Sequence, residues 1–97
     1  MSEMEMLLSV LNDDLKDSEM FFDYAKRAKS MGNEQLCQMF VVRARERISK
    51  FRQTIEHVRK EARKTENPMW DKLGELMLQN DEEKINTLEY NITKMSK

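Results

Sequence analysis

The sequence has very few of the residues that end helices or cross-link chains. Its 97 residues include two glycines, one proline and one cysteine. So few glycines and prolines leave little material for the tight turns of a β-sheet and favour long helices. The single cysteine, Cys37, excludes a disulfide within the chain, so a reducing compartment is the simplest expectation. A chain of this length is expected to form one domain, residues 1–97, with one modest core.

Long apolar runs are also missing from the sequence. No stretch approaches the roughly 18 apolar residues that indicate a membrane helix. The N-terminal segment MSEMEMLLSVLNDDLKD is acidic ahead of its apolar residues, whereas a secretory signal begins with basic residues. We therefore expect no membrane association and a cytoplasmic location.

Charged residues of both signs are abundant, but they are separated into blocks. Residues 1–24 hold seven acids and one lysine, residues 43–64 hold nine cations and three acids, and residues 65–97 hold seven acids and four cations. The isoelectric point of about 5.9 is far below the value above about 9 that is usual for nucleic-acid-binding domains, so we expect no nucleic-acid partner. The basic block is instead predicted to pair with acidic helices on its flanks, which favours one alignment of the helices more than it adds stability.

Apolar residues recur at helical intervals in two long segments that predict an antiparallel hairpin. The first helix is predicted over residues 2–31 and the second over residues 34–64, with Gly32 ending one helix and Asn33 capping the next. The first stripe contains Leu7, Leu11, Asp14, Ser18, Phe21, Ala25 and Ala28. The second contains Cys37, Val41, Ala44, Ile48, Phe51, Ile55, Val58 and Ala62.

A third helix is predicted after Pro68, which is well placed in a first helical turn. Its polar stretch at residues 79–83 leaves two possibilities, a continuous or slightly kinked helix, which we favour, or two shorter helices. The predicted fold class is all-α, with three long helices in an antiparallel up-down bundle. The apolar residues of this segment are Met69, Trp70, Leu73, Leu76, Met77, Ile85, Leu88, Ile92 and Met95.

The segment LKDSEMFFDYAKRAKSMGNEQLCQMFVVRARERISKF, residues 15–51, carries an aromatic pair, Tyr24-Ala25, Gly32, Glu34-Gln35-Leu36 and Phe40. In this pattern it resembles the first helical hairpin of ferritin-like, rubrerythrin-type proteins. The resemblance extends over residues 13–51, about 40% of the chain. It implies a ferritin-like hairpin, which in that family supplies a glutamate and a Glu-x-x-His pair to a di-iron centre.

The metal ligands of that family are not retained here. Aligned on Gly32 and Phe40, the first ligand position falls on Asp14 and the Glu-x-x-His positions fall on Arg47 and Lys50; shifted by one, they fall on Glu46 and Ser49. The resemblance therefore implies the fold without the metal, and we expect no metal, no cofactor and no catalytic residues. The hypothesis that follows is an ion pair of Asp14 with Arg47 and Lys50 between the helices, in the space that metal fills in the family. The alternative places Asp14 in water at the edge of its stripe.

The remaining residues with chemical potential have simpler interpretations. Cys37 lies on the second stripe and is predicted to be an inert core thiol. The lone histidine, His57, is predicted to be solvated. Met69, Trp70 and Met77 are the candidate interface residues, since aromatic and methionine side chains make adaptable contacts.

The function expected from these features is that of a non-enzymatic interaction or structural protein with a ferritin-like fold that lacks the di-iron site. We expect a homodimer in which the third helix completes the partner's bundle or caps its own, with an unidentified protein as the other possible partner. The alternative is a metal-dependent oxidoreductase or iron-handling protein with an unusual carboxylate site. Its candidate ligands are Asp14, Asp17, Glu46 and Glu82 or Glu83.

Overall fold

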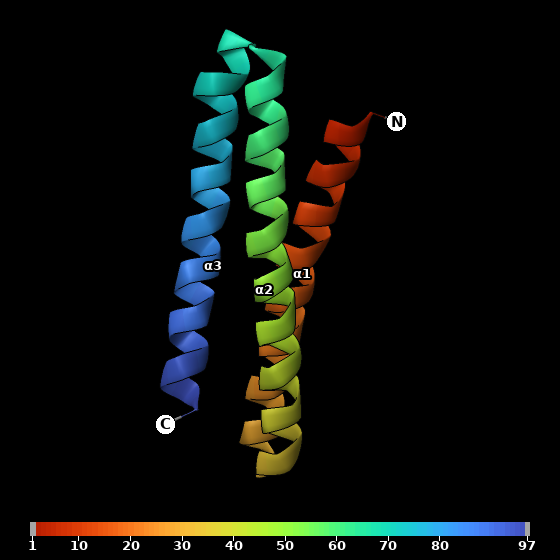
Figure 1. The fold of residues 1–97 in the computed structure, drawn as a ribbon. Helices are drawn as coiled ribbons and strands as arrows, with labels where there is room; N and C mark the ends of the chain where they lie inside the picture. The colour runs from red at the N-terminus through yellow and green to blue at the C-terminus, as the bar shows by residue number, and fades with distance from the viewer. Residues whose placement is uncertain (1, 97) are drawn as a thin grey trace.

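The structure, a computed structural model, describes residues 2–96, except for the side chain of Trp70. Helices α1 (Glu3–Ser30) and α2 (Glu34–Thr65) form an antiparallel hairpin. After a π-helical turn, η1 (Trp70–Gly74), helix α3 (Glu75–Met95) returns alongside α2, so that α1 and α3 point in the same direction (Figure 1). The predicted all-α class with three long helices is confirmed.

The turn between α1 and α2 is built by Gly32 and Asn33. Gly32 has a φ of 77°, and its N–H donates to the carbonyl of Lys29 (3.0 Å) while the N–H of Asn33 donates to that of Ala28 (2.9 Å). This pair of hydrogen bonds is the Schellman motif, which satisfies the last carbonyls of a helix. The side chain of Asn33 then accepts a hydrogen bond from the N–H of Leu36 (3.0 Å) and caps α2. Both roles that the sequence predicted for this turn are confirmed.

The connection from α2 to the third helical segment is short. Glu66 takes a left-handed conformation with a φ of 49°, and the side chain of Asn67 accepts a hydrogen bond from the N–H of Met69 (3.0 Å). Helix resumes at Pro68 and remains helical through the polar residues 79–83. The prediction of one continuous helix is therefore confirmed, with the π-helical turn near its start.

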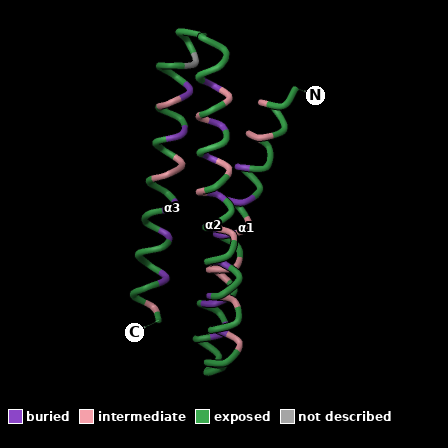
Figure 2. Tube along the Cα trace, in the orientation of Figure 1, coloured by how far each residue is buried: buried purple, intermediate pink, exposed green. Residues whose placement is uncertain are grey.

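The core follows the stripes that the sequence predicted for α1 and α2. All eight residues of the α2 stripe, from Cys37 to Ala62, are buried, and purple segments recur along that helix (Figure 2). In α1, Leu7 and Phe21 are partly buried and the other five residues of the stripe are buried, including the polar Asp14 and Ser18. The free thiol of Cys37 is 1% exposed.

The core face of α3 differs from the sequence prediction in its first half. Leu78, which the prediction omitted, is buried, whereas Leu73, Leu76 and Met77 are exposed. Leu76, Met77 and Leu78 are consecutive and therefore point about 100° apart on a helix. Only Leu78 is seven residues from the buried Ile85, so it is the one that continues the core face.

The N-terminal end of α1 diverges from the other two helices, so the bundle is open at that end (Figure 1). Met4, Leu7 and Leu8 are only partly buried against the core there. Within residues 2–96, no helix combines the length and the apolar character that crossing a membrane requires.

Candidate functional site

Arg47 of α2 lies against two carboxylates of α1. Its Nη1 atom is 3.8 Å from Oδ1 of Asp14, and its Nε atom is 3.9 Å from Oδ2 of Asp17. The side chain of Asp14 is 7% exposed and that of Arg47 is 37% exposed, so the carboxylate is in the interior while the guanidinium reaches it from the edge. The sequence hypothesis placed Arg47 beside Asp14, and the structure brings these two groups together.

Asp14 is in an environment that disfavours its charge. Burial raises the pKa of Asp14, and the nearby charges of Arg47 and Lys50 lower it by less. Lys50, the third member of the predicted pair, is exposed, and its influence on this pKa is smaller than that of Arg47. Ser18, the other polar residue of the stripe, donates its hydroxyl to the carbonyl oxygen of Asp14 (2.7 Å), which satisfies the hydroxyl inside the helix.

Arg59 and Arg52 connect α2 to α3. Arg59 donates to Glu75 (Nη2 to Oε1, 2.9 Å) and also to both carboxylate oxygens of Glu82. Arg52 donates to Oε1 of Glu89 (3.1 Å). The hydrogen bonds that Arg59 donates lower the pKa of Glu82, and the acceptance of these bonds by Glu82 and Glu75 raises the pKa of Arg59. Cations of α2 thus pair with acids on both neighbouring helices, as the sequence predicted for the basic block.

These particular pairs were not predicted from the sequence, although their spacing contains a signal for them. Arg52 and Arg59 are seven residues apart, and so are Glu75, Glu82 and Glu89 in succession. Residues seven apart share one side of a helix. Two such sets of opposite charge on neighbouring antiparallel helices predict a charged contact. The five residues form what we call the α2–α3 charge ladder: Arg52, Arg59, Glu75, Glu82 and Glu89.

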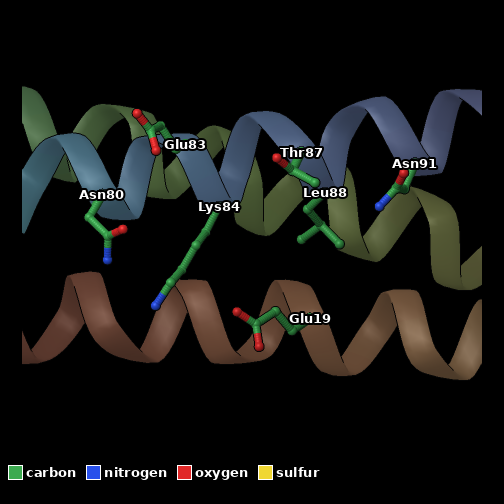
Figure 3. Close-up of a pocket in the computed structure, with 7 residues that line it drawn as sticks. All are labelled: Glu19, Asn80, Glu83, Lys84, Thr87, Leu88 and Asn91. Carbon is green, nitrogen blue, oxygen red and sulfur yellow. The ribbon is translucent and has the colours of Figure 1, made fainter.

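A groove of about 410 Å³ lies between α1 and α3 (Figure 3). Amide, hydroxyl and charged groups surround it, with Lys84 of α3 extending toward α1 and Glu19 lying along the edge of α1. Such groups can form hydrogen bonds with a polar ligand. The groove is lined by Glu19, Asn80, Glu83, Lys84, Thr87, Leu88 and Asn91.

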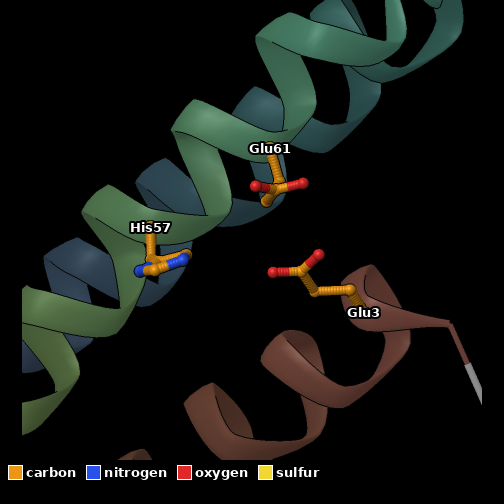
Figure 4. A group of neighbouring side chains, drawn as sticks. All are labelled: Glu3, His57 and Glu61. Carbon is orange, nitrogen blue, oxygen red and sulfur yellow. The ribbon is translucent and has the colours of Figure 1, made fainter.

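Among the described residues, one group of three potential metal ligands comes together. Glu3 of α1 faces His57 and Glu61 of α2 (Figure 4), and one ligand atom of each lies within 4.8 Å of the others. This group was not predicted from the sequence, because Glu3 is 54 positions from His57 in the chain. The four-residue interval from His57 to Glu61 was the available signal, since it places both on one side of a helix.

The predicted interface residues lie at the start of the third helical segment. Met69 and Met77 are exposed, whereas the side chain of Trp70 lies outside the described residues. Comparison of the chain with known protein families, with curated proteins and with solved structures finds no match. The function has therefore to be argued from the geometry of these groups.

Proposed function

We propose that this protein is a non-enzymatic helical interaction protein that forms a homodimer through the first half of its third helical segment. The observation that carries the proposal is the exposure of four large apolar side chains there, at 58–69% of their surface. Apolar side chains gathered at one place on a surface mark an interaction site more often than scattered ones do. The four residues, named here the α3 apolar patch, are Met69, Leu73, Leu76 and Met77.

The spacing of residues along α3 relates this patch to the groove beside α1. Leu73, Met77, Asn80 and Lys84 follow one another at intervals of four, three and four residues, which keeps them on one side of the helix. Asn80 and Lys84 line the groove. Leu73 and Met77 therefore extend the groove-facing side of α3 toward the end where α1 diverges, and a helix of a second copy placed there would complete the bundle.

A second copy is the occupant that best fits this surface. Three of the four patch residues lie at intervals of four, Met69, Leu73 and Met77, and form a narrow apolar stripe that two identical helices could share about a two-fold axis. Methionine side chains adapt their shape to a partner. Within the proposal, the protein has a ferritin-like hairpin in which Arg47 stands beside Asp14 in place of a di-iron centre.

The alternative of an iron-dependent enzyme receives less support from the geometry. Asp14 and Asp17 lie beside Arg47, Glu82 lies beside Arg59, and Glu46 lies beside Arg43 (3.4 Å). A cation close to each of these carboxylates opposes the binding of a positively charged ion.

The test is the oligomeric state of the wild type and two variants, measured by sedimentation velocity over a range of concentrations in buffer with EDTA. We expect the wild type to dimerise and Met77→Lys to weaken the association by about tenfold or more, or about 1.4 kcal/mol. The matched control is Tyr90→Lys, because Tyr90 is similarly exposed, at 63% against 66% for Met77, but lies in the other half of α3. A wild type that stays monomeric, or equal effects of the two substitutions, would contradict the homodimer.

A further inference from the structure

We infer that Glu3, His57 and Glu61 form a binding site for a divalent transition-metal ion, which ties the N-terminal end of α1 to α2. The site is separate from Asp14 and from the groove. It also differs from the Glu-x-x-His pattern of the ferritin-like proteins, because its imidazole and one carboxylate are four residues apart and its third ligand comes from another helix.

The geometry of the three side chains suits such an ion. His57 and Glu61 are one turn apart on α2, and the carboxylate of Glu3 extends toward them from the first turn of α1 (Figure 4). Ligand atoms about 2.1 Å from a tetrahedral ion are about 3.4 Å from one another. The present separations, up to 4.8 Å, therefore need to close by up to about 1.4 Å. Glu3 and His57 are exposed and Glu61 is partly exposed, so side-chain rotation can supply this movement.

The ligand types select the class of ion. One imidazole and two carboxylates suit Zn²⁺ and its neighbours in the first transition row, whereas Mg²⁺ and Ca²⁺ prefer sites made of oxygen alone. The two carboxylates also balance the two positive charges of the ion. Three protein ligands leave a fourth position for water, as is usual for zinc sites that are not fully closed by protein.

Lys64 competes with the ion in the unloaded site. Its Nζ atom donates a hydrogen bond to Oε1 of Glu61 at 3.0 Å. An ion that binds here has to displace this ammonium group from Glu61. Removal of the ammonium group therefore strengthens binding, which is an unusual result for a surface substitution and a specific test of the site.

The consequence of binding is structural. The first turns of α1 diverge from the rest of the bundle (Figure 1), and Met4 and Leu7 are only partly buried there. An ion that joins Glu3 to α2 holds this end of α1 against its neighbour. Because the ion binds the folded chain and not the unfolded one, its presence raises the melting temperature.

The experiment is calorimetric titration of the full-length protein with Zn²⁺ in chelator-free buffer, with Mg²⁺ as the comparison ion. We expect saturable binding of one Zn²⁺ per chain, none of Mg²⁺, and a melting temperature that rises with Zn²⁺ and falls back with EDTA. His57→Ala and Glu3→Gln should each weaken binding by roughly tenfold or more, since even residues behind the ligands have effects of that size. Lys64→Ala should strengthen it. The buried thiol of Cys37 does not compete in the folded protein.

Glu56→Gln is the matched control, because Glu56 is an exposed carboxylate next to His57 in sequence that does not belong to the group of three. It should bind Zn²⁺ as the wild type does. The substituted side chains are exposed, so the variants should fold, and unchanged helical circular dichroism verifies this. Absence of saturable binding at millimolar Zn²⁺, or equal affinity of the wild type and His57→Ala, would overturn the inference.

Discussion

The guanidinium of Arg47 lies 3.8 Å from the carboxylate of Asp14, and of the two side chains only that of Asp14 is buried. This asymmetry determines what each residue loses when the other is removed. Without Arg47, a buried carboxylate keeps its charge and loses its nearest cation. Without the charge of Asp14, Arg47 still has solvent and the carboxylate of Asp17, 3.9 Å away.

We therefore predict that Arg47→Met is the more damaging substitution of the pair. It should lower the free energy of unfolding by about 1–2 kcal/mol at neutral pH, the range for a buried polar group that loses its partner. Asp14→Asn should have a smaller effect, and the double variant should be more stable than Arg47→Met alone. Urea unfolding of all four proteins gives the coupling energy. Arg43→Met is the control, because Arg43 is exposed and pairs within its own helix, and an equal loss there would remove the special role of Arg47.

A second prediction concerns the pH dependence that Asp14 gives to stability. Burial raises the pKa of Asp14 above its ordinary value of 3.8, so the folded chain takes up this proton at a higher pH than the unfolded chain does. The contribution of Asp14 to stability is therefore fully present below pH 3.8 and is lost as the pH rises through the folded-state pKa.

Asp14→Asn removes this titration from the folded and unfolded states. The stability of the variant relative to the wild type should accordingly increase as the pH rises from about 4 to about 7. Urea midpoints measured at several pH values test this. A relative stability that stays constant with pH would show that Asp14 has the same pKa in both states.

A third prediction separates the two arginines of the α2–α3 charge ladder. The side chain of Arg59 is 17% exposed and contacts Glu75 and Glu82, whereas that of Arg52 is 41% exposed. Arg59→Met should cost about 2 kcal/mol, because it leaves two carboxylates without their cation, and Arg52→Met about 0–1 kcal/mol, as for surface pairs. Thermal and urea unfolding measure the two losses of stability. Equal losses in Arg59→Met and Arg52→Met would contradict the prediction.

The same contact predicts a loss of stability in acid. Hydrogen bonds from Arg59 lower the pKa of Glu82 below its ordinary value of 4.5. The stabilisation is therefore present above pH 4.5 and is lost as the pH falls through the lower folded-state pKa. Arg59→Met should reduce this acid-induced loss, whereas Arg43→Met should leave it unchanged.

A fourth prediction compares the two residues with left-handed backbone. Gly32 has a φ of 77° with no atom within 4 Å of an added Cβ, so Gly32→Ala should cost about 1 kcal/mol through backbone conformation alone. Glu66 has a φ of 49°, and Glu66→Gly should stabilise the protein by about 0.5 kcal/mol, since glycine adopts this conformation without steric cost. The unfolding midpoint should fall below that of the wild type in Gly32→Ala and rise above it in Glu66→Gly. A loss of stability in both variants would contradict the prediction for Glu66.

The hairpin could be predicted from the sequence because each of its determinants is local. The stripe from Cys37 to Ala62 repeats at intervals of four and three without interruption, and Gly32 and Asn33 identify the turn by their residue types. The core face of α3 was harder to predict, because Leu76, Met77 and Leu78 are adjacent and composition alone does not select one of them. The selection comes from packing against α2, which only the continuation to Ile85 indicated.

The candidate sites also differ in whether they could be predicted from the sequence. The position of Arg47 near Asp14 was expected from the resemblance to the ferritin-like hairpin, whose ligand positions fall on these two residues. The group of Glu3, His57 and Glu61 could not be predicted, because its formation depends on how far the end of α1 diverges from α2. That angle results from packing along the whole length of both helices and has no local signature.

The α2–α3 charge ladder has a repeat of seven residues on both helices, and this places a limit on what it can specify. If α3 slid along α2 by one repeat, a distance of about 10.5 Å, Arg59 would still face Glu75 and Arg52 would face Glu82. The shifted alignment would thus keep two of the three ion pairs between these helices, so electrostatic pairing alone discriminates only weakly against it. The two residues between the helical segments, Glu66 and Asn67, are too short a connection to permit the sliding, so chain connectivity, and not charge, excludes the second alignment.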